Sequence, residues 1–111
     1  MKDKEISFEE VFDRIKFTDE EVLNKVKEAY EFAKAEHNGL KRLSGDDYIT
    51  HPLHVANILI DLNVDEVTII AALLHEVLNN GNTASKEILE DKFGFEVAKI
   101  VDSVSKINNL N

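Results

Sequence analysis

The sequence predicts an all-α protein, a bundle of five or six helices. Apolar residues recur at helical spacing along most of the chain, and no segment shows the sustained apolar–polar alternation of a half-buried strand. Capping residues stand before several of the periodic segments, and glycine or asparagine follows them. At 111 residues the chain is expected to form one domain with a substantial core.

Two capping boxes open the first two predicted helices. Ser7 with Glu10 predicts a short helix through Ile15, and Thr18 with Glu21 predicts the start of the next. The second helix is expected to end near residues 38–39, Asn-Gly, a good C-terminal stop. Its apolar stripe comprises Val22, Val26, Ala29, Tyr30 and Ala33.

The middle of the chain predicts two further helices. Thr50 is the expected N-cap of the first, since Pro52 is tolerated in a first turn, and Asn63 ends it. The face expected to be buried carries Val55, Ile58, Leu59 and Leu62. The segment 65–78 is apolar nearly all round and is therefore expected to be the central helix.

The C-terminal part predicts two more helices after a break at residues 79–82, Asn-Asn-Gly-Asn. A short helix runs from Ser85 to Phe93, where Gly94 stops it, and an amphipathic helix follows to about Ile107. The inner face expected for this last helix carries Val97, Ile100, Val101, Val104 and Ile107.

Composition and charge exclude several classes of function. A net charge of −9 argues against sequence-independent nucleic-acid binding, which needs a basic face. The absence of cysteine excludes disulfides, thiolate zinc sites and cysteine nucleophiles. The longest apolar run, residues 67–74, is too short to cross a membrane, and the N-terminus does not resemble a signal peptide. A cytoplasmic protein with no membrane partner is expected.

Two histidines and a carboxylate are the candidate chemical groups. His51 stands at a helix start, while His75 and Glu76 lie within the apolar segment, so the three can form a divalent-metal site that hydrolyses phosphate esters. The alternatives are a core histidine at 75 that hydrogen-bonds within the protein, and an exposed capping-region histidine at 51. His37 and His54 are assigned no chemical role.

A short basic cluster, Lys41-Arg42, stands close to Gly39 and Ser44-Gly45. It is either a local anion site or a solvated loop.

Three segments, in order, resemble the N-terminal HD domain of the RelA/SpoT family, which makes and degrades the alarmone (p)ppGpp. They are AYEFAKAEHNGLKRLSGDDYITHPLHVANIL (29–59), AALLHEV (71–77) and FGFEVAKIVDSVSKI (93–107). The resemblance runs roughly from Val22 to Leu110. It implies one HD-like domain, with residues 1–17 as an N-terminal extension helix and 18–111 as the core.

The resemblance implies manganese-dependent hydrolysis of the 3′-pyrophosphate of (p)ppGpp. His51 and His75 match the two histidine ligands of the family, and Glu76 stands where its aspartate would coordinate Mn²⁺. Arg42 and Ser44 match the loop that contacts the guanine nucleotide.

Departures from the family pattern weaken the expectation of catalysis. Glu76 replaces the aspartate, and Asn79-Asn80 replace a Glu-Asp pair that supports water activation. Leu43 stands at a usually basic position, with Asp46-Asp47 nearby in place of Glu-Pro. The chain also stops at Asn111, before a segment that would match the family's later metal aspartate.

These departures favour a truncated, hydrolase-inactive domain that regulates a synthetase domain outside this chain. The alternatives are a weak Mn²⁺-dependent (p)ppGpp 3′-pyrophosphohydrolase that uses His51, His75 and Glu76, and a module that binds the nucleotide without hydrolysis. Truncation further predicts an exposed apolar stripe on the last helix, through which two copies would dimerise. That stripe comprises Val97, Ile100, Val101 and Val104.

Overall fold

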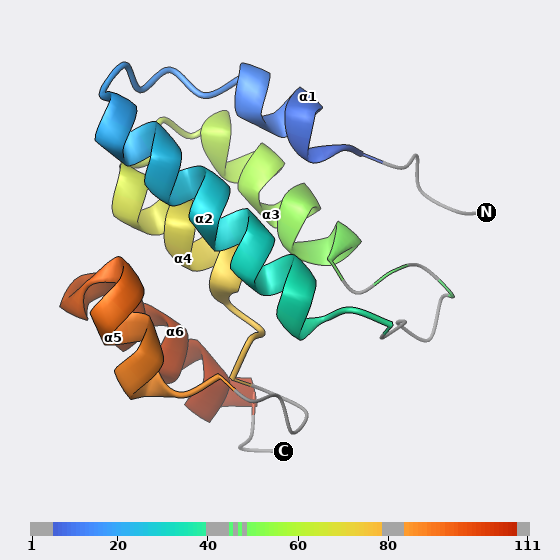
Figure 1. Ribbon diagram of the computed structural model, residues 1–111. Coiled ribbons are helices and arrows are strands. Elements are labelled where there is room, and N and C mark those ends of the chain that lie inside the picture. Colours follow the sequence, from blue (N-terminus) through green and yellow to red (C-terminus); the bar gives the residue numbers. More distant parts are fainter. Residues whose placement is uncertain (1–5, 40–44, 46, 48, 79–83, 109–111) are drawn as a thin grey trace.

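The computed structural model describes residues 6–39, 45, 47, 49–78 and 84–108. Six α-helices account for its regular structure, and the described residues contain no strand element (Figure 1). This confirms the prediction of an all-α bundle. The helices are α1 (Phe8–Asp13), α2 (Glu20–Glu36), α3 (Thr50–Ile60), α4 (Glu66–Leu74), α5 (Lys86–Phe93) and α6 (Phe95–Asn108).

Side-chain caps begin most of these helices. Ser7 caps α1 by accepting a hydrogen bond from the backbone N–H of Glu10, as predicted. The predicted cap of α2 is wrong by one residue, because the Asp19 carboxylate, and not Thr18, accepts the backbone N–H groups of Glu21 and Val22. An aspartate satisfies the orphan donors and also favours the positive end of the helix dipole.

The start of α3 also differs from the expectation. Thr50 is the first helical residue and Ile49 occupies the cap position, without a side-chain hydrogen bond to the helix. The Thr50 backbone N–H instead donates to the carbonyl of Asp47, 3.0 Å away. His51 consequently lies within the first turn of α3.

Helix α4 is the centre of the bundle, as predicted. It packs against α2, α3 and α6 (Figure 1), and every residue from Ile69 to Leu74 is buried. It ends at Leu74, earlier than expected, and residues 75–78 form a turn in which the Val77 N–H donates to the Leu74 carbonyl. His75 and Glu76 therefore lie just beyond a helix end.

The predicted buried faces of two helices are partly wrong. On α3, Leu53 and Ala56 are buried, whereas Ile58 is 62% exposed, and Leu62, in the turn after α3, is 65% exposed.

On α6, Val97 and Val101 are buried, but Ile100 and Ile107, which were expected to face inward, are exposed. The expected exposed stripe is therefore wrong for Val97 and Val101, and the exposed apolar side chains of α6 are Phe95, Ile100 and Ile107.

Helices α1, α5 and α6 complete the bundle. Val11 of α1 is buried, and Phe8 stacks on Tyr30 of α2 with ring centroids 4.2 Å apart. Helices α5 and α6 form a hairpin at Gly94, which has φ 94° (Figure 1). No helix among the described residues has both the length and the apolar character needed to cross a membrane.

Candidate metal centre

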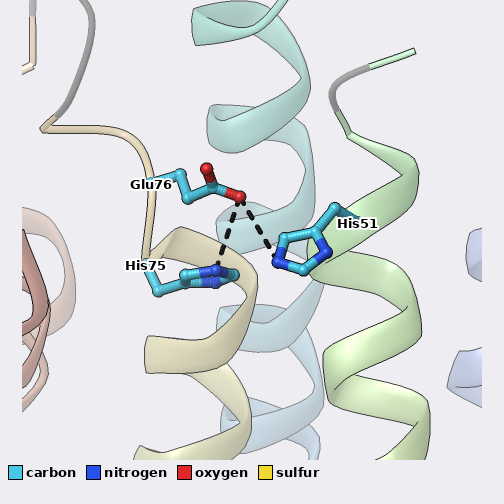
Figure 2. Close-up of side chains that lie close together, drawn as sticks. All are labelled: His51, His75 and Glu76. Carbon is cyan, nitrogen blue, oxygen red and sulfur yellow. Dashed lines mark ion pairs between the residues drawn. The ribbon is translucent and has the colours of Figure 1, made fainter. Parts of the chain in front are cut away.

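The ends of two helices bring His51, His75 and Glu76 together. His51 projects from the start of α3, and the other two residues come directly after α4 (Figure 2). Oε1 of Glu76 lies 3.4 Å from Nε2 of His75 and 3.6 Å from Nε2 of His51. One ligand atom from each residue can be chosen so that all three lie within 4.8 Å of one another.

One hydrogen bond determines what His75 offers to this group. Its Nδ1 lies 2.6 Å from the backbone carbonyl of Ala72, and because a carbonyl can only accept, Nδ1 carries a proton and donates it. In a neutral imidazole the lone pair is then on Nε2, which faces the Glu76 carboxylate. A cation between these two acceptor atoms would be bound by both.

Burial distinguishes the members of the group. The side chains of Glu76 and His75 are 11% and 17% exposed, whereas that of His51 is 39% exposed. A carboxylate with so little solvent is costly unless it is paired or bound to a metal. The group is therefore most accessible from the side of His51.

The donor set fits a divalent transition metal. Two imidazole nitrogens and one carboxylate oxygen suit Mn²⁺, Fe²⁺, Co²⁺ or Zn²⁺. A donating N–H on the second nitrogen of His75 is the usual way in which a metal-binding histidine is held in orientation. Three protein ligands also leave coordination positions for a substrate or water.

Most other residues singled out in the sequence cannot be placed relative to this group. Arg42, Ser44, Asn79 and Asn80 lie outside the described residues, as do Leu43 and Asp46. His54 is one turn beyond His51 on α3 but is absent from the group, and its buried Nε2 has no hydrogen-bond partner among the described residues.

His37 is a residue whose setting the sequence interpretation missed. It is the C-cap of α2 and only 3% exposed. Burial lowers the pKa of its imidazole, and the nearby carboxylates of Glu76 and Glu36 oppose this effect. Helical spacing continues from the buried positions Val26, Ala29 and Ala33 to position 37. This spacing is the sequence signal from which a buried His37 side chain could have been predicted.

Comparisons with known proteins identify the family of this chain. Residues 29–111 match the model of the HD domain family. A guanosine-3′,5′-bis(diphosphate) 3′-pyrophosphohydrolase of Aquifex aeolicus is 43% identical over 106 residues, which are 96% of this chain and 15% of that protein. A GTP pyrophosphokinase of Brucella ovis is 42% identical over 92 residues, 83% of this chain and 12% of that protein.

A third relative, a probable GTP pyrophosphokinase of Mycobacterium leprae, is 46% identical over 89 residues, 79% of this chain. The chain spans only 11% of that protein's length. These relatives thus contain far more chain than the part compared here.

Proposed function

Because the chain belongs to the HD domain family, and its relatives are named for (p)ppGpp hydrolysis and GTP pyrophosphokinase activity, we propose that it binds a divalent cation and (p)ppGpp without efficient hydrolysis. Its role is then regulatory, toward a synthetase domain outside this chain. The observation that carries the proposal is the convergence of His51, His75 and Glu76.

Each member of the group has a defined part in this proposal. His75 and His51 present imidazole nitrogens to the cation, here Mn²⁺, and Glu76 supplies the negative charge. When bound, such a cation polarises a phosphoryl oxygen and lowers the pKa of bound water. The more exposed side, at His51, is where a phosphate group of the nucleotide enters. Arg42 and Ser44 are proposed to contact the nucleotide, as the family resemblance implies.

The acid–base part of the site is what the chain lacks. Asn79 and Asn80 stand where the family has a Glu-Asp pair, and an amide cannot accept a proton near neutral pH. Loss of general-base help typically costs about 10²–10⁴-fold in rate. The extra methylene of Glu76 moves its oxygen by roughly 1 Å relative to an aspartate, which further disturbs a tuned geometry. Slow hydrolysis with preserved binding follows.

A cation titration tests the binding part of the proposal. Mn²⁺ is added to the protein, to His75→Ala and to His54→Ala, and binding heat and melting temperature are recorded. Mn²⁺ should stabilise the parent and His54→Ala but not His75→Ala, since His54 lies on the same helix as His51 but outside the group. Equal responses of all three proteins would contradict cation binding by this group.

A second experiment decides between the regulatory role and the alternative, a weak (p)ppGpp 3′-pyrophosphohydrolase. Pyrophosphate release from (p)ppGpp is measured with Mn²⁺ for the parent, Glu76→Gln and the double variant Asn79→Glu/Asn80→Asp. The regulatory proposal expects negligible release by the parent and a gain in the double variant. Release by the parent that disappears in Glu76→Gln supports the alternative, which the convergence of the three ligands favours. Nucleotide binding without Mn²⁺ binding would instead indicate a simple nucleotide-binding module.

Coupling to a synthetase is tested in the longer parent protein. Hydrogen–deuterium exchange should change in the synthetase part when Mn²⁺ or (p)ppGpp binds this domain. A regulatory domain must interact differently with two conformational states of the synthetase, and ligand binding here then shifts the balance between those states. Unchanged exchange there would rule out the regulatory role.

We also propose self-association through the outer face of α6. The exposed side chains of Ile100 and Ile107 border a surface groove of about 510 Å³ that also includes Val67 of α4. Lys99 and Glu96 line the same groove, so that a two-fold arrangement can oppose unlike charges.

A further inference from the structure

A small apolar pocket lies at the end of the bundle away from the candidate metal centre. One wall is the connection from α1 to α2, and the other is the turn between α3 and α4 (Figure 1). The metal centre lies at the opposite ends of α3 and α4. The volume of the pocket is about 130 Å³, and its apolar lining comprises Ile15, Phe17, Ile60, Val64 and Ile69.

Arg14 joins the two walls of this pocket. Its guanidinium, at the C-cap of α1, donates a hydrogen bond to the backbone carbonyl of Asn57 on α3, 3.1 Å away, and pairs with the carboxylate of Asp61. Val11, which is buried in the core, also anchors α1. Because the walls are already in place, a ligand does not have to order them, and such preorganisation favours affinity.

The floor and the mouth of the pocket differ in chemistry. Ile69 is 1% exposed and forms the floor, whereas Lys16 is exposed and therefore lies at the mouth. Lys16 is the one charged residue among the described residues of the lining, and it has no hydrogen bond or ion pair within the described part of the chain. The Asp61 carboxylate on the opposite wall is paired with Arg14. An apolar pocket with few polar groups is typical of small-molecule sites, because those groups fix the orientation of the ligand.

The size of the pocket limits what it can hold. Apolar cavities of about 150 Å³ bind benzene. A volume of about 130 Å³ with an open mouth therefore accommodates a phenyl ring or a branched chain of about four or five carbon atoms. Pockets that enclose drug-sized ligands have about 300–1,000 Å³, so a nucleotide does not fit here.

We propose that this pocket binds a small apolar monocarboxylate, with its phenyl or branched hydrocarbon body against Ile69 and its carboxylate at the Lys16 ammonium. The apolar body leaves water on entry, while the carboxylate stays hydrated at the mouth and is attracted by the charge of Lys16. The inference goes beyond the proposed function and does not depend on cation binding by His51 and His75.

Benzoate and benzyl alcohol are the probes that test this site, because they share a phenyl ring and differ in charge. Each is titrated at constant ionic strength into the isotope-labelled parent, Lys16→Gln and Lys99→Gln, and the NMR shifts of backbone amides give the affinity. Saturable shifts are expected at residues 15–17, 60–64 and 69 of the parent, with tighter binding of benzoate. Lys16→Gln should weaken benzoate binding by about two- to fivefold, as expected for a solvent-exposed ion pair, and leave benzyl alcohol binding unchanged. Lys99→Gln, the same change on α6 outside this pocket, should bind as the parent does.

Two results of this titration would overturn the inference. If neither probe gives saturable shifts at these residues, ligands of this class do not bind here. If both probes bind the parent with equal affinity, Lys16 attracts no carboxylate, and the pocket instead suits an apolar side chain of a partner protein.

Filling the pocket tests its location independently. Val64→Phe places a ring in the cavity and should abolish binding of both probes, whereas Leu62→Phe, at an exposed position of the same turn, should leave binding intact. Unchanged binding by a folded Val64→Phe would contradict the proposed site. If Val64→Phe does not fold, Phe17→Ala replaces it, because this change enlarges the pocket and should favour naphthoate over benzoate relative to the parent. An unchanged preference in Phe17→Ala would count equally against the site.

Discussion

His75 uses one ring nitrogen for the Ala72 carbonyl, so its chemistry is confined to the other. The next residue, Glu76, lies in the turn after α4, and the backbone at His75 keeps right-handed helical angles, φ −62° and ψ −18°. At the residue scale, the site therefore combines two adjacent side chains of this turn with His51 from the start of α3.

The charge of Glu76 is expected to contribute most of the cation affinity. Glu76→Gln keeps the shape of the side chain but removes the anionic ligand, and we predict at least a tenfold loss of Mn²⁺ affinity by calorimetry, about 1.4 kcal/mol or more. Glu87→Gln, an identical change on the exposed surface of α5, is the control and should bind as the parent does. Similar losses in both variants would indicate a general electrostatic effect instead.

The chemical identities of His51, His75 and Glu76 could be read from the sequence, but their convergence could not. It requires the start of α3 to meet the end of α4, which is a result of tertiary packing. His37 was overlooked because a histidine at a helix C-terminus is also explained by the helix dipole. The register of position 37 with the buried positions of α2 was the local signal of its burial, and the packing of α4 against α2 accounts for that burial.

At the scale of the helix, some caps were predictable, but the caps of α2 and α3 and the end of α4 were not. Ser7, Asp65 and Ser85 each precede a helix and accept a backbone hydrogen bond, a local interaction that sequence encodes directly. The face of α3 was misassigned because its apolar residues cover more than one stripe, and only the positions of α1 and α4 select Leu53 over Ile58.

Gly94 is expected to be difficult to replace. It joins α5 to α6 with φ 94° and ψ 163°, a backbone region that essentially only glycine adopts. A Cβ atom here would meet nothing within 4 Å, so the cost of Gly94→Ala comes from the backbone alone, about 1–3 kcal/mol in unfolding free energy.

Urea denaturation measures that cost. Asn63→Gly is the matched control, since Asn63 also has a positive φ, 54°, and glycine adopts it without strain. An unchanged midpoint for Gly94→Ala would show that the hairpin tolerates a different turn.

The N-cap carboxylate of Asp65, before α4, should make the stability of the fold depend on pH in the acid range. Hydrogen bonds from the Thr68 hydroxyl and backbone N–H lower the pKa of this N-cap carboxylate, so the folded state favours its ionised form. The resulting stability is present above the ordinary carboxyl pKa, about 3.9, and is lost as pH falls through the lowered folded value. Asp65→Asn, which caps without a charge, should lack this part of the acid dependence.

Melting temperatures of the parent and Asp65→Asn, recorded between pH 2.5 and 7, test this expectation. The melting temperature of the parent should exceed that of Asp65→Asn by a constant amount above about pH 5, and this difference should shrink as the solution is acidified. A difference independent of pH would contradict a role for the charge.

On the scale of the whole molecule, charge acts in opposite directions on the two proposed ligands. A net charge of −9 attracts a divalent cation but repels a highly anionic nucleotide, so the cation should bind first and favour the nucleotide. The apolar surface of α6 is a separate property, because Ile100 and Ile107 border a groove at the start of α4, whereas His75 follows the end of α4.

Self-association is predicted to depend on that surface. Sedimentation velocity over a range of protein concentrations should show a monomer–dimer equilibrium for the parent, and Ile107→Glu should shift it to monomer by placing a charge in the interface. Ile58→Glu, at a similarly exposed position on α3, should still dimerise. A parent that stays monomeric at every concentration would contradict the proposal.

A cation bound by both His51 and His75 should affect the rate at which the domain unfolds. A cation held by both residues would close the chain between them into a loop, as a removable cross-link does, and so restrict how α3 and α4 can separate. If this closure forms only after the helices have packed, its stabilisation resides in the native state and not in the folding transition state. Bound cation would then slow unfolding and leave the folding rate nearly unchanged. The lifetime of the folded domain would thus report the concentration of free metal.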